Sequence, residues 1–395
     1  MKRFIMIMLV AVMALTMVAC GKKAPVASES SIPDKHLSPP DSSSVPKDVP
    51  LPEKRLLANG VTTLTIDVNA IIPGRRLREF FPYNDSYYAM ILQEGDYDNL
   101  DPTIELYFID PENGKILDKY YTFEHDSPTG EFYSVVVYEA LDGYHVCCDE
   151  IAYVISGSPE TSIDIKKIDY NRADTKKIDV ISSKDGKWYA YVEDDAVLVN
   201  TETGERITPY VGRREGDDEV TYTASRPAGF SEDYFFFRTV GYEWFNGYGA
   251  YNLKTGEVSL YDDLVDLYIS PTNANSNRFP YTVLWEEFGY IDTSDLSKRV
   301  TLFNPKETTE GEIFDALQGC RRFTSVNIGN GQYLGTFAEN ADNACKFAAI
   351  DSESLKVVYT SDFGELSSYP YTLGKYVAFF KTTVDTKELT IISFP

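Results

Sequence analysis

Hydrophobic and polar residues alternate along most of the chain beyond its first sixty positions, in runs short enough to be single β-strands. Clear examples are residues 63–68, 104–108 and 388–392. In such a run successive side chains point to opposite faces, so one face can be buried. Almost no stretch has the 3.6-residue period of an amphipathic helix. The pattern predicts an all-β domain with one short helix at 310–318, which Gly319 would end.

A second pattern repeats within this domain: a strand that ends in Asp or Asn, a tight turn, and a second strand. In a hairpin of this kind Gly supplies a positive φ angle, and the Asp or Asn side chain accepts hydrogen bonds from the turn. The repeated unit begins at Asp110, Asn200 and Asn252, with looser copies at Asp292 and Asp351.

The spacing of these units predicts the architecture. Successive copies lie 52, 40 and 59 residues apart from Asn200 onward, and the 90 residues from Asp110 to Asn200 predict one further copy near 163–164 or 168–169. A period in the forties with four strands per unit is typical of a β-propeller blade. We therefore predict, over residues 55–395, a propeller of about seven four-stranded blades, with six to eight compatible. Residues 62–68 are expected to complete the last blade beside 371–395, because closing the ring removes exposed edges. A two-sheet or two-domain β protein is the alternative.

The amino terminus has the pattern of an export signal. Lys2 and Arg3 precede an uncharged apolar stretch that is too short to span a membrane, so residues 1–19 are predicted to be a signal peptide. Residues 17–21, Met-Val-Ala-Cys-Gly, resemble the lipobox of bacterial lipoproteins, with Met17 where Leu is usual. The resemblance implies that Cys20 carries lipid, including fatty acids such as palmitate, on the mature protein. An ordinary secretory signal with an incidental Cys is the alternative.

Residues 20–54 are rich in Ser, Pro and Lys and contain seven prolines. A segment with so few apolar residues cannot offset its ordering entropy, so it is predicted to be a disordered linker. Together with the lipid on Cys20, it would hold the domain away from a membrane, on the extracytoplasmic face at the cell surface or in the periplasm.

The charge of the chain narrows the classes of partner. The net charge is −24, and cleavage after Ala19 would remove two positive charges, so the mature protein carries −26. An acidic domain repels nucleic acid and anionic lipid head groups, which leaves the lipid anchor as its expected contact with a membrane. No nucleic-acid partner is expected.

Cysteine and histidine usage gives little chemistry. Beyond Cys20 the chain has Cys147, Cys148, Cys320 and Cys345, no CxxC pair, and three His, so neither a metal site nor a cofactor is predicted. Free buried thiols are expected at Cys147 or Cys148. A bridge between Cys320 and Cys345 is geometrically conceivable in an exported protein.

No catalytic residue is identified, because the hydrolase elbow G-x-S-x-G, the zinc motif H-E-x-x-H and the phosphate-binding P-loop are all absent. The sequence therefore favours a protein that is not an enzyme. Aromatic residues offer the only ligand-binding candidates, since they could stack on sugars or form a protein-binding hot spot. Packing between blades is the alternative for most of them. The candidates are Tyr242, Trp244, Tyr248 and Trp285.

Two segments carry a family resemblance. Residues 182–191, Ser-Ser-Lys-Asp-Gly-Lys-Trp-Tyr-Ala-Tyr, resemble the opening of a TolB-type or WD40-like blade, and the hairpin at Asn252 is similar to repeats of PQQ-like propellers. The resemblance implies the propeller architecture alone. A rigid disc with two loop faces on a lipid-anchored tether favours a membrane-anchored, non-enzymatic binding or assembly module that uses its propeller loops, with an envelope protein or a glycan as partner. A glycan-binding or glycan-active envelope protein is the alternative function, and a sensor of a small ligand is a third.

Overall fold

A computed structural model describes most of the chain beyond residue 51, all of it within one compact unit, Ser38–Pro395. The predicted signal peptide, Cys20 and nearly all of the predicted linker lie outside the described residues. The described residues are 52–95, 100–124, 135–148, 151–169, 178–213, 221–240, 246–261, 278–283, 287–292, 299–366, 369–382 and 387–395.

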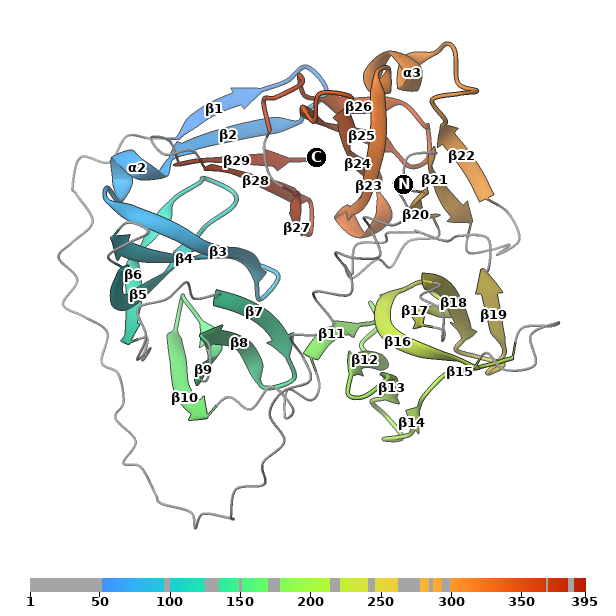
Figure 1. Cartoon of the computed structure of the whole chain (residues 1–395), viewed down its shortest axis with the longest axis horizontal. Helices are drawn as coiled ribbons and strands as arrows, with labels where there is room; N and C mark the ends of the chain where they lie inside the picture. Colours follow the sequence, from blue (N-terminus) through green and yellow to red (C-terminus); the bar gives the residue numbers. More distant parts are fainter. Residues whose placement is uncertain are drawn as a thin grey trace, which may run out of the picture. The chain divides into compact units, whose positions relative to one another are not determined.

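Six antiparallel sheets form a ring, as Figure 1 shows. The eight-stranded sheet comprises two blades joined by the pair Ile178↔Ala140, so the ring has seven blades and the predicted β-propeller is confirmed. The first three blades each contain four consecutive strands. Blade one contains β3 (Arg75–Tyr83), β4 (Tyr87–Gly95), β5 (Leu100–Ile109) and β6 (Ile116–Glu124). Blade two contains β7 (Val135–Ala140), β8 (Gly143–Cys148), β9 (Ile151–Ser158) and β10 (Ser162–Asp169). Blade three contains β11 (Ile178–Ser182), β12 (Trp188–Val192), β13 (Ala196–Asn200) and β14 (Arg206–Ile207).

The next three blades vary this plan. Blade four contains β16 (Thr221–Phe230), β17 (Tyr234–Val240), β18 (Asn246–Asn252) and β19 (Val258–Tyr261), with β15 (Tyr210–Arg213) added beside β16. Blade five contains three described strands, β20 (Arg278–Val283), β21 (Glu287–Asp292) and β22 (Arg299–Phe303). Blade six contains β23 (Cys320–Ile328), the short 3-10 helix η2 (Gly329–Gly331), β24 (Tyr333–Asn340), β25 (Cys345–Asp351) and β26 (Val357–Thr360). Helix α3 (Glu312–Leu317) connects blades five and six, within the predicted range, and Gly319 follows it with a φ of 83°.

Blade seven closes the ring with strands from both ends of the domain. Strands β27 (Tyr371–Leu373), β28 (Tyr376–Thr382) and β29 (Lys387–Ser393) are joined by β2 (Thr62–Asp67), which pairs with β29 from Thr62↔Ser393 to Asp67↔Glu388. The predicted closure by residues 62–68 is therefore confirmed. Strand β1 (Glu53–Leu56) adds a fifth, exposed strand beside β2. Helix α2 (Val68–Ile71) then leads into blade one, and Asp67 caps it by accepting a hydrogen bond from the Ala70 N–H at 3.0 Å.

The core lies mainly between blades. Among the described residues, six of the seven clusters of buried apolar side chains contain residues from two neighbouring blades. Phe80 and Phe81 show how one strand serves two such clusters. Phe80 packs against Phe380 of blade seven, whereas Phe81 packs against Tyr144 of blade two. Successive side chains of a strand point to opposite faces of the blade. The alternating apolar residues of one strand can therefore pack against both neighbouring blades.

The repeated turn has the predicted geometry. The N–H of Asp110, Asn200 and Asn252 donates to the carbonyl five residues later at 2.9, 2.9 and 2.8 Å. In each of these turns the fourth residue after the Asp or Asn is a Gly with φ between 70° and 75°, as a left-handed position requires. In blade six Leu355 occupies this position with a φ of 56°, and Asp351 makes the equivalent bond to Lys356 at 2.9 Å.

One predicted copy of the turn was misplaced. Residues 163–164 and 168–169 lie within β10, and the turn of blade two is at Ser158, where the Thr161 N–H donates to the Ser158 carbonyl at 3.1 Å. A Ser replaces the usual Asp or Asn, and the turn is shorter, so the sequence pattern was not recognised. The corrected position divides the 90-residue gap into 48 and 42 residues, which brings it within the range of a blade.

The innermost strand of blade two carries a carboxyl group with an unusual proton affinity. The side chain of Glu139 is exposed to solvent on β7, where the charges of Asp85 and Asp179 act on it. Desolvation, with smaller contributions from Asp85 and Asp179, raises the pKa of Glu139 from 4.5 to about 7. A raised pKa means that the folded state binds this proton more tightly than the unfolded chain does.

This difference predicts a pH-dependent loss of stability. Because the folded state binds the proton more tightly, the contribution of Glu139 to stability falls as the pH rises from 4.5 to about 7. Glu139→Gln should flatten the dependence of the melting temperature on pH across this window and raise that temperature at pH 8. Thermal unfolding from pH 5 to 8 measures the effect, with the exposed Glu307→Gln as control. Equal slopes for the wild type and Glu139→Gln would contradict the assignment.

Candidate functional site

The turns between first and second strands and those between third and fourth strands lie at the same face of the propeller. Three blades show this by the same hydrogen bond, from the backbone N–H after the third strand to a carbonyl of the first turn. The bonds are Thr201 N–H to Lys187 O at 2.8 Å, Leu253 N–H to Asp233 O at 2.9 Å and Ser352 N–H to Gln332 O at 2.9 Å. We call this surface the turn face. Its backbone is fixed by these bonds, whereas its side chains are largely exposed.

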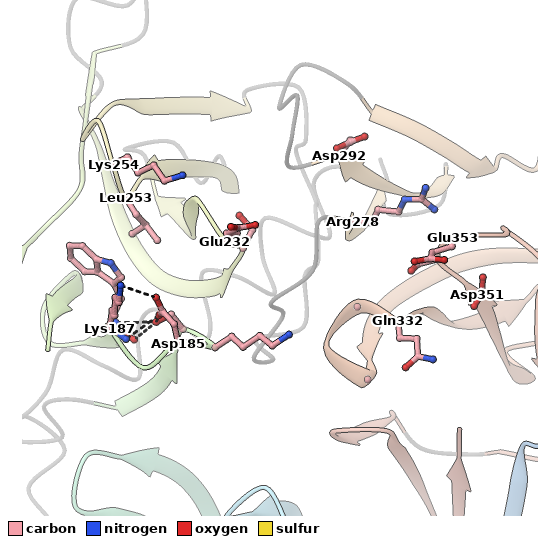
Figure 2. A pocket seen from close by; sticks show the side chains of 17 residues that line it. Asp185, Lys187, Glu232, Leu253, Lys254, Arg278, Asp292, Gln332, Asp351 and Glu353 are labelled. Carbon is pink, nitrogen blue, oxygen red and sulfur yellow. Dashed lines mark hydrogen bonds and ion pairs between the residues drawn. The ribbon is translucent and has the colours of Figure 1, made fainter. Parts of the chain in front are cut away.

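A pocket of about 1380 Å³ opens among the turns of blades three to six, as Figure 2 shows. Its lining comes from the turns that follow β11, β16, β18, β23 and β25. Blade five contributes Arg278 at the start of β20 and Asp292 at the end of β21. Strand β21 ends at this pocket with Asp292, as the third strands β18 and β25 end beside it in blades four and six. Strand β21 is therefore the third strand of blade five, in agreement with the repeat predicted at Asp292.

The turn of blade three is held by its own polar side chains. The hydroxyl of Ser183 donates to the Asp185 carboxylate at 2.8 Å, and the Lys187 N–H donates to the same carboxylate oxygen at 3.1 Å. These bonds, that of Ser183 first, lower the pKa of Asp185. The Trp188 N–H in turn donates to the Ser183 hydroxyl at 3.0 Å. Asp185 therefore stabilises the turn, and the exposed Lys184 and Lys187 flank it.

The turn of blade four repeats this arrangement in a shorter form. The Tyr234 N–H donates to the Ser231 hydroxyl at 3.2 Å, and the Ser231 N–H donates to the Tyr234 carbonyl at 2.9 Å. Lys254, in the neighbouring turn, places its Nζ 2.6 Å from the Asp233 carboxylate, with 70% of the Lys254 side chain exposed. Ser231 thus plays the part of Ser183, and a lysine again lies at the rim.

The opposite side of the pocket, from blades five and six, is dominated by carboxylates. Asp351 accepts hydrogen bonds from the N–H and the hydroxyl of Ser354, both at 2.7 Å, and these bonds lower the pKa of Asp351. Glu353 is exposed in the same turn. The Arg278 guanidinium lies 5.0 Å from the centre of the Tyr290 ring, a cation–π distance.

The charges of the pocket are therefore distributed unevenly. All three lysines of the lining belong to blades three and four, where Asp185 and Glu232 accompany them. Blades five and six contribute one cation, Arg278, and three carboxylates, those of Asp292, Asp351 and Glu353. Figure 2 shows the two groups facing each other across the pocket. We call them the lysine wall and the carboxylate wall.

The structure places one of the four aromatic candidates. Tyr248 lies on β18 with 1% of its surface exposed, in a cluster with Phe236 and Tyr281 between blades four and five. Its ring is therefore packing material in this structure, the alternative that the sequence left open. Tyr242, Trp244 and Trp285 lie outside the described residues, as does Cys20.

Sequence reasoning missed the lysines of the pocket. Residues 182–191 were identified as the opening of a blade, but nothing in a linear pattern shows that Lys184 and Lys187 face a pocket shared with Lys254. A useful signal was a Ser at the start of each turn. Ser183 bonds to Asp185 two positions later, and Ser231 bonds to Tyr234 three positions later.

The four cysteines of the described residues form no disulfide. Cys147 and Cys148 are buried without a disulfide, so the predicted buried thiols are confirmed. The conceivable bridge between Cys320 and Cys345 is not formed, because β24 lies between their strands: Cys320 pairs with Asn340, and Cys345 with Glu339. Strands are about 4.8 Å apart, so alternate strands exceed the roughly 7 Å that a disulfide tolerates between Cα atoms. Burial raises the pKa of the Cys320 thiol to about 12, which leaves it unreactive at neutral pH.

Two further observations concern the described residues alone. In that part of the chain, no three His, Cys, Asp or Glu side chains are grouped so that they could hold a metal ion. Within the same ranges, no helix has both the length and the apolar character needed to cross a membrane.

Seven blades closed by β2 make this chain a β-propeller protein. No family model and no curated protein matches the sequence. Among solved structures, the chain is similar to a dihydro-heme d1 dehydrogenase in complex with DHE, at 14% identity and a TM-score of 0.39, over 82% of this chain and 66% of that one. It is similar to TolB from Acinetobacter baumannii, at 13% identity and a TM-score of 0.32, over 76% and 78% of the two chains.

A third similar structure is the β-propeller domain of the Trilobed protease from Pyrococcus furiosus, at 11% identity and a TM-score of 0.39, over 80% of this chain and 93% of that one. The chain covers 66% of the dehydrogenase, which is just under two thirds of its length. At identities of 14% or lower these comparisons concern the fold alone.

Proposed function

We propose that the protein is a lipid-anchored, extracytoplasmic binding module that holds its partner in the pocket of the turn face. The observation that carries the proposal is the pocket itself, built by turns of four separate blades around exposed charged side chains. Binding residues commonly lie on loops that a rigid scaffold holds in place. The turns of this pocket are held in this way by the blades. An envelope protein is the expected partner.

The role is proposed to be binding without catalysis. Two pocket carboxylates, those of Asp185 and Asp351, accept hydrogen bonds within their own turns, and these bonds lower their pKa values. Acid–base catalysis at neutral pH is served best by groups whose pKa lies near the working pH. Carboxylates held in their charged form by turn bonds suit recognition better than proton transfer.

The anchoring half of the proposal depends on the lipobox-like residues 17–21. Lipid with two or three acyl chains on Cys20 would hold the protein stably at a membrane. Strand β1, at the outer edge of blade seven, is the point where the linker would enter the ring. Metabolic labelling with a radioactive fatty acid should mark the wild type, and Cys20→Ala should lose both the label and membrane association. A labelled Cys20→Ala protein would contradict lipidation at this residue.

The binding half is tested by quantitative pull-down from envelope extract with the full chain. Lys187→Glu/Lys254→Glu should reduce the captured partner about tenfold, because reversal of interface charges weakens association. The matched control is Lys306→Glu/Arg321→Glu, which reverses two exposed charges outside the pocket. Equal capture by the two double variants would contradict a role for the pocket. Release of products from cell-wall polysaccharides would instead favour a glycan-active enzyme.

A further inference from the structure

The pocket of the turn face has all three of its lysines on one side and three of its five carboxylates on the other. We infer that its ligand is a zwitterionic oligopeptide whose carboxylate end lies at the lysine wall and whose ammonium end lies at the carboxylate wall. This inference rests on the proposed function and names the chemical class of the ligand.

The lysine wall can exchange its present partners for a ligand carboxylate. The Lys187 ammonium is 4.0 Å from Asp185, and both side chains are 56% exposed. Lys254 pairs with Asp233, and its side chain is 70% exposed. Ion pairs as exposed as these contribute little to stability, so a ligand carboxylate can compete for the lysines. Hydrogen bonds within the turn hold the Asp185 carboxylate in place, so it cannot follow the Lys187 side chain when that side chain turns toward a ligand.

The carboxylate wall has the opposite balance. Asp351 is fixed by two hydrogen bonds from Ser354 and stays charged, and Glu353 extends from the same turn into solvent. Asp292 adds a third carboxylate from blade five, against the single cation Arg278. An ammonium group with three donors suits a wall of carboxylate oxygens, which only accept.

The size of the pocket favours an oligomer over a single small metabolite. Its volume of about 1380 Å³ exceeds the roughly 300–1,000 Å³ of ordinary small-molecule sites. A peptide with free ends carries one positive and one negative charge, separated by a distance that its length sets. Neutral glycans and polyanions lack this pairing of charges. Complementary walls would therefore bind a peptide in one orientation, since charge complementarity fixes register.

The test uses four versions of one Ala–Ser hexapeptide: free at both ends, acetylated at the amino end, amidated at the carboxyl end, and blocked at both. Titration calorimetry with the full chain at low salt should show the free peptide binding most tightly. Each blocking group should weaken binding about tenfold, and high salt should reduce the differences, because exposed charges are screened.

Variants then separate the two walls. Lys184→Glu/Lys187→Glu should abolish the preference for a free carboxylate and keep the preference for a free amine. Glu353→Lys should do the reverse. The controls are Lys306→Glu/Arg321→Glu and Asp342→Lys, which change exposed charges outside the pocket lining. These controls should leave both preferences unchanged.

The outcomes distinguish the ligand class from the proposed function. Two results would overturn the inference and leave the proposed binding module intact. One is equal binding of all four peptides. The other is the absence of peptide binding, although Lys187→Glu/Lys254→Glu still loses the captured envelope partner. Preferential binding of a zwitterionic glycan over the free peptide would also overturn it. If capture is insensitive to that variant, the proposed function fails as well.

Discussion

Leu64→Asn should lower the free energy of unfolding by about 4–8 kcal/mol, the largest effect expected of any single change considered for this protein. Leu64 lies on β2 with 2% of its surface exposed, in the cluster that joins blade seven to blade one. Asn keeps the branched skeleton of Leu, so the cost is not a cavity. The change loses the burial of an apolar side chain, worth about 1.5–3 kcal/mol, and buries an amide donor and an amide acceptor without partners, at about 1–3 kcal/mol each. Because β2 also closes the ring, the loss should affect the whole domain.

Chemical denaturation followed by intrinsic fluorescence measures the change. The matched control is Thr65→Asn, one position along the same strand, where the side chain leaves the opposite face and is only half buried. It should cost less than about 1 kcal/mol. As a further check, a synthetic peptide of residues 52–68 added to Leu64→Asn should raise its stability by supplying a replacement strand. Similar destabilisation by the two Asn variants would show that Leu64 is not part of the core between blades seven and one.

Gly249→Ala should destabilise the protein by about 2–3 kcal/mol, although a single methyl group is added and Ala suits a strand no worse than Gly. Gly249 pairs with Phe237 across β17 and β18. A Cβ at this position would overlap the Phe237 ring. That ring is fully buried and packs 5.8 Å from Phe235, so it has no free space to occupy. The expected destabilisation therefore comes from the clash with the Phe237 ring and not from a backbone angle that Ala cannot adopt.

A double-mutant cycle tests this cause. Phe237→Leu alone should destabilise the protein, but the double variant Gly249→Ala/Phe237→Leu should be more stable than the sum of the single effects by at least about 1 kcal/mol. Denaturation midpoints of the four proteins give the coupling. Simple additivity would mean that the two positions do not interact, and that Gly249 is required for another reason.

The repeated turn explains how far the sequence predicted the fold. A hairpin needs a residue that tolerates positive φ and an acceptor for the backbone, and both demands are local, so Asp110, Asn200 and Asn252 could be recognised from the chain alone. Ser158 escaped recognition because a shorter turn needs neither residue. Leu355 adopts the positive φ that Gly usually supplies, so the copy at Asp351 matched the pattern only loosely.

The pairing of Cys320 and Cys345 shows what spacing cannot predict. Twenty-five residues allow a bridge, but the insertion of β24 between the two strands separates the thiols. Likewise, the aromatic Tyr248 has the composition of a binding residue, and only its place between blades four and five shows that it is core. Burial depends on which blade lies opposite, which is a property of the closed ring.

The sequence by itself determined the all-β class, the hairpin repeat, the short helix after blade five and the closure of the ring by residues 62–68, because each depends on alternation or turn chemistry along neighbouring positions. The tertiary structure decided the pocket. Its lysines and carboxylates come from turns up to about 170 residues apart, at Lys184 and Glu353, and no local rule relates them. They meet because blades three to six place equivalent turns on one face, so the charge pattern of the site exists only once the ring is closed.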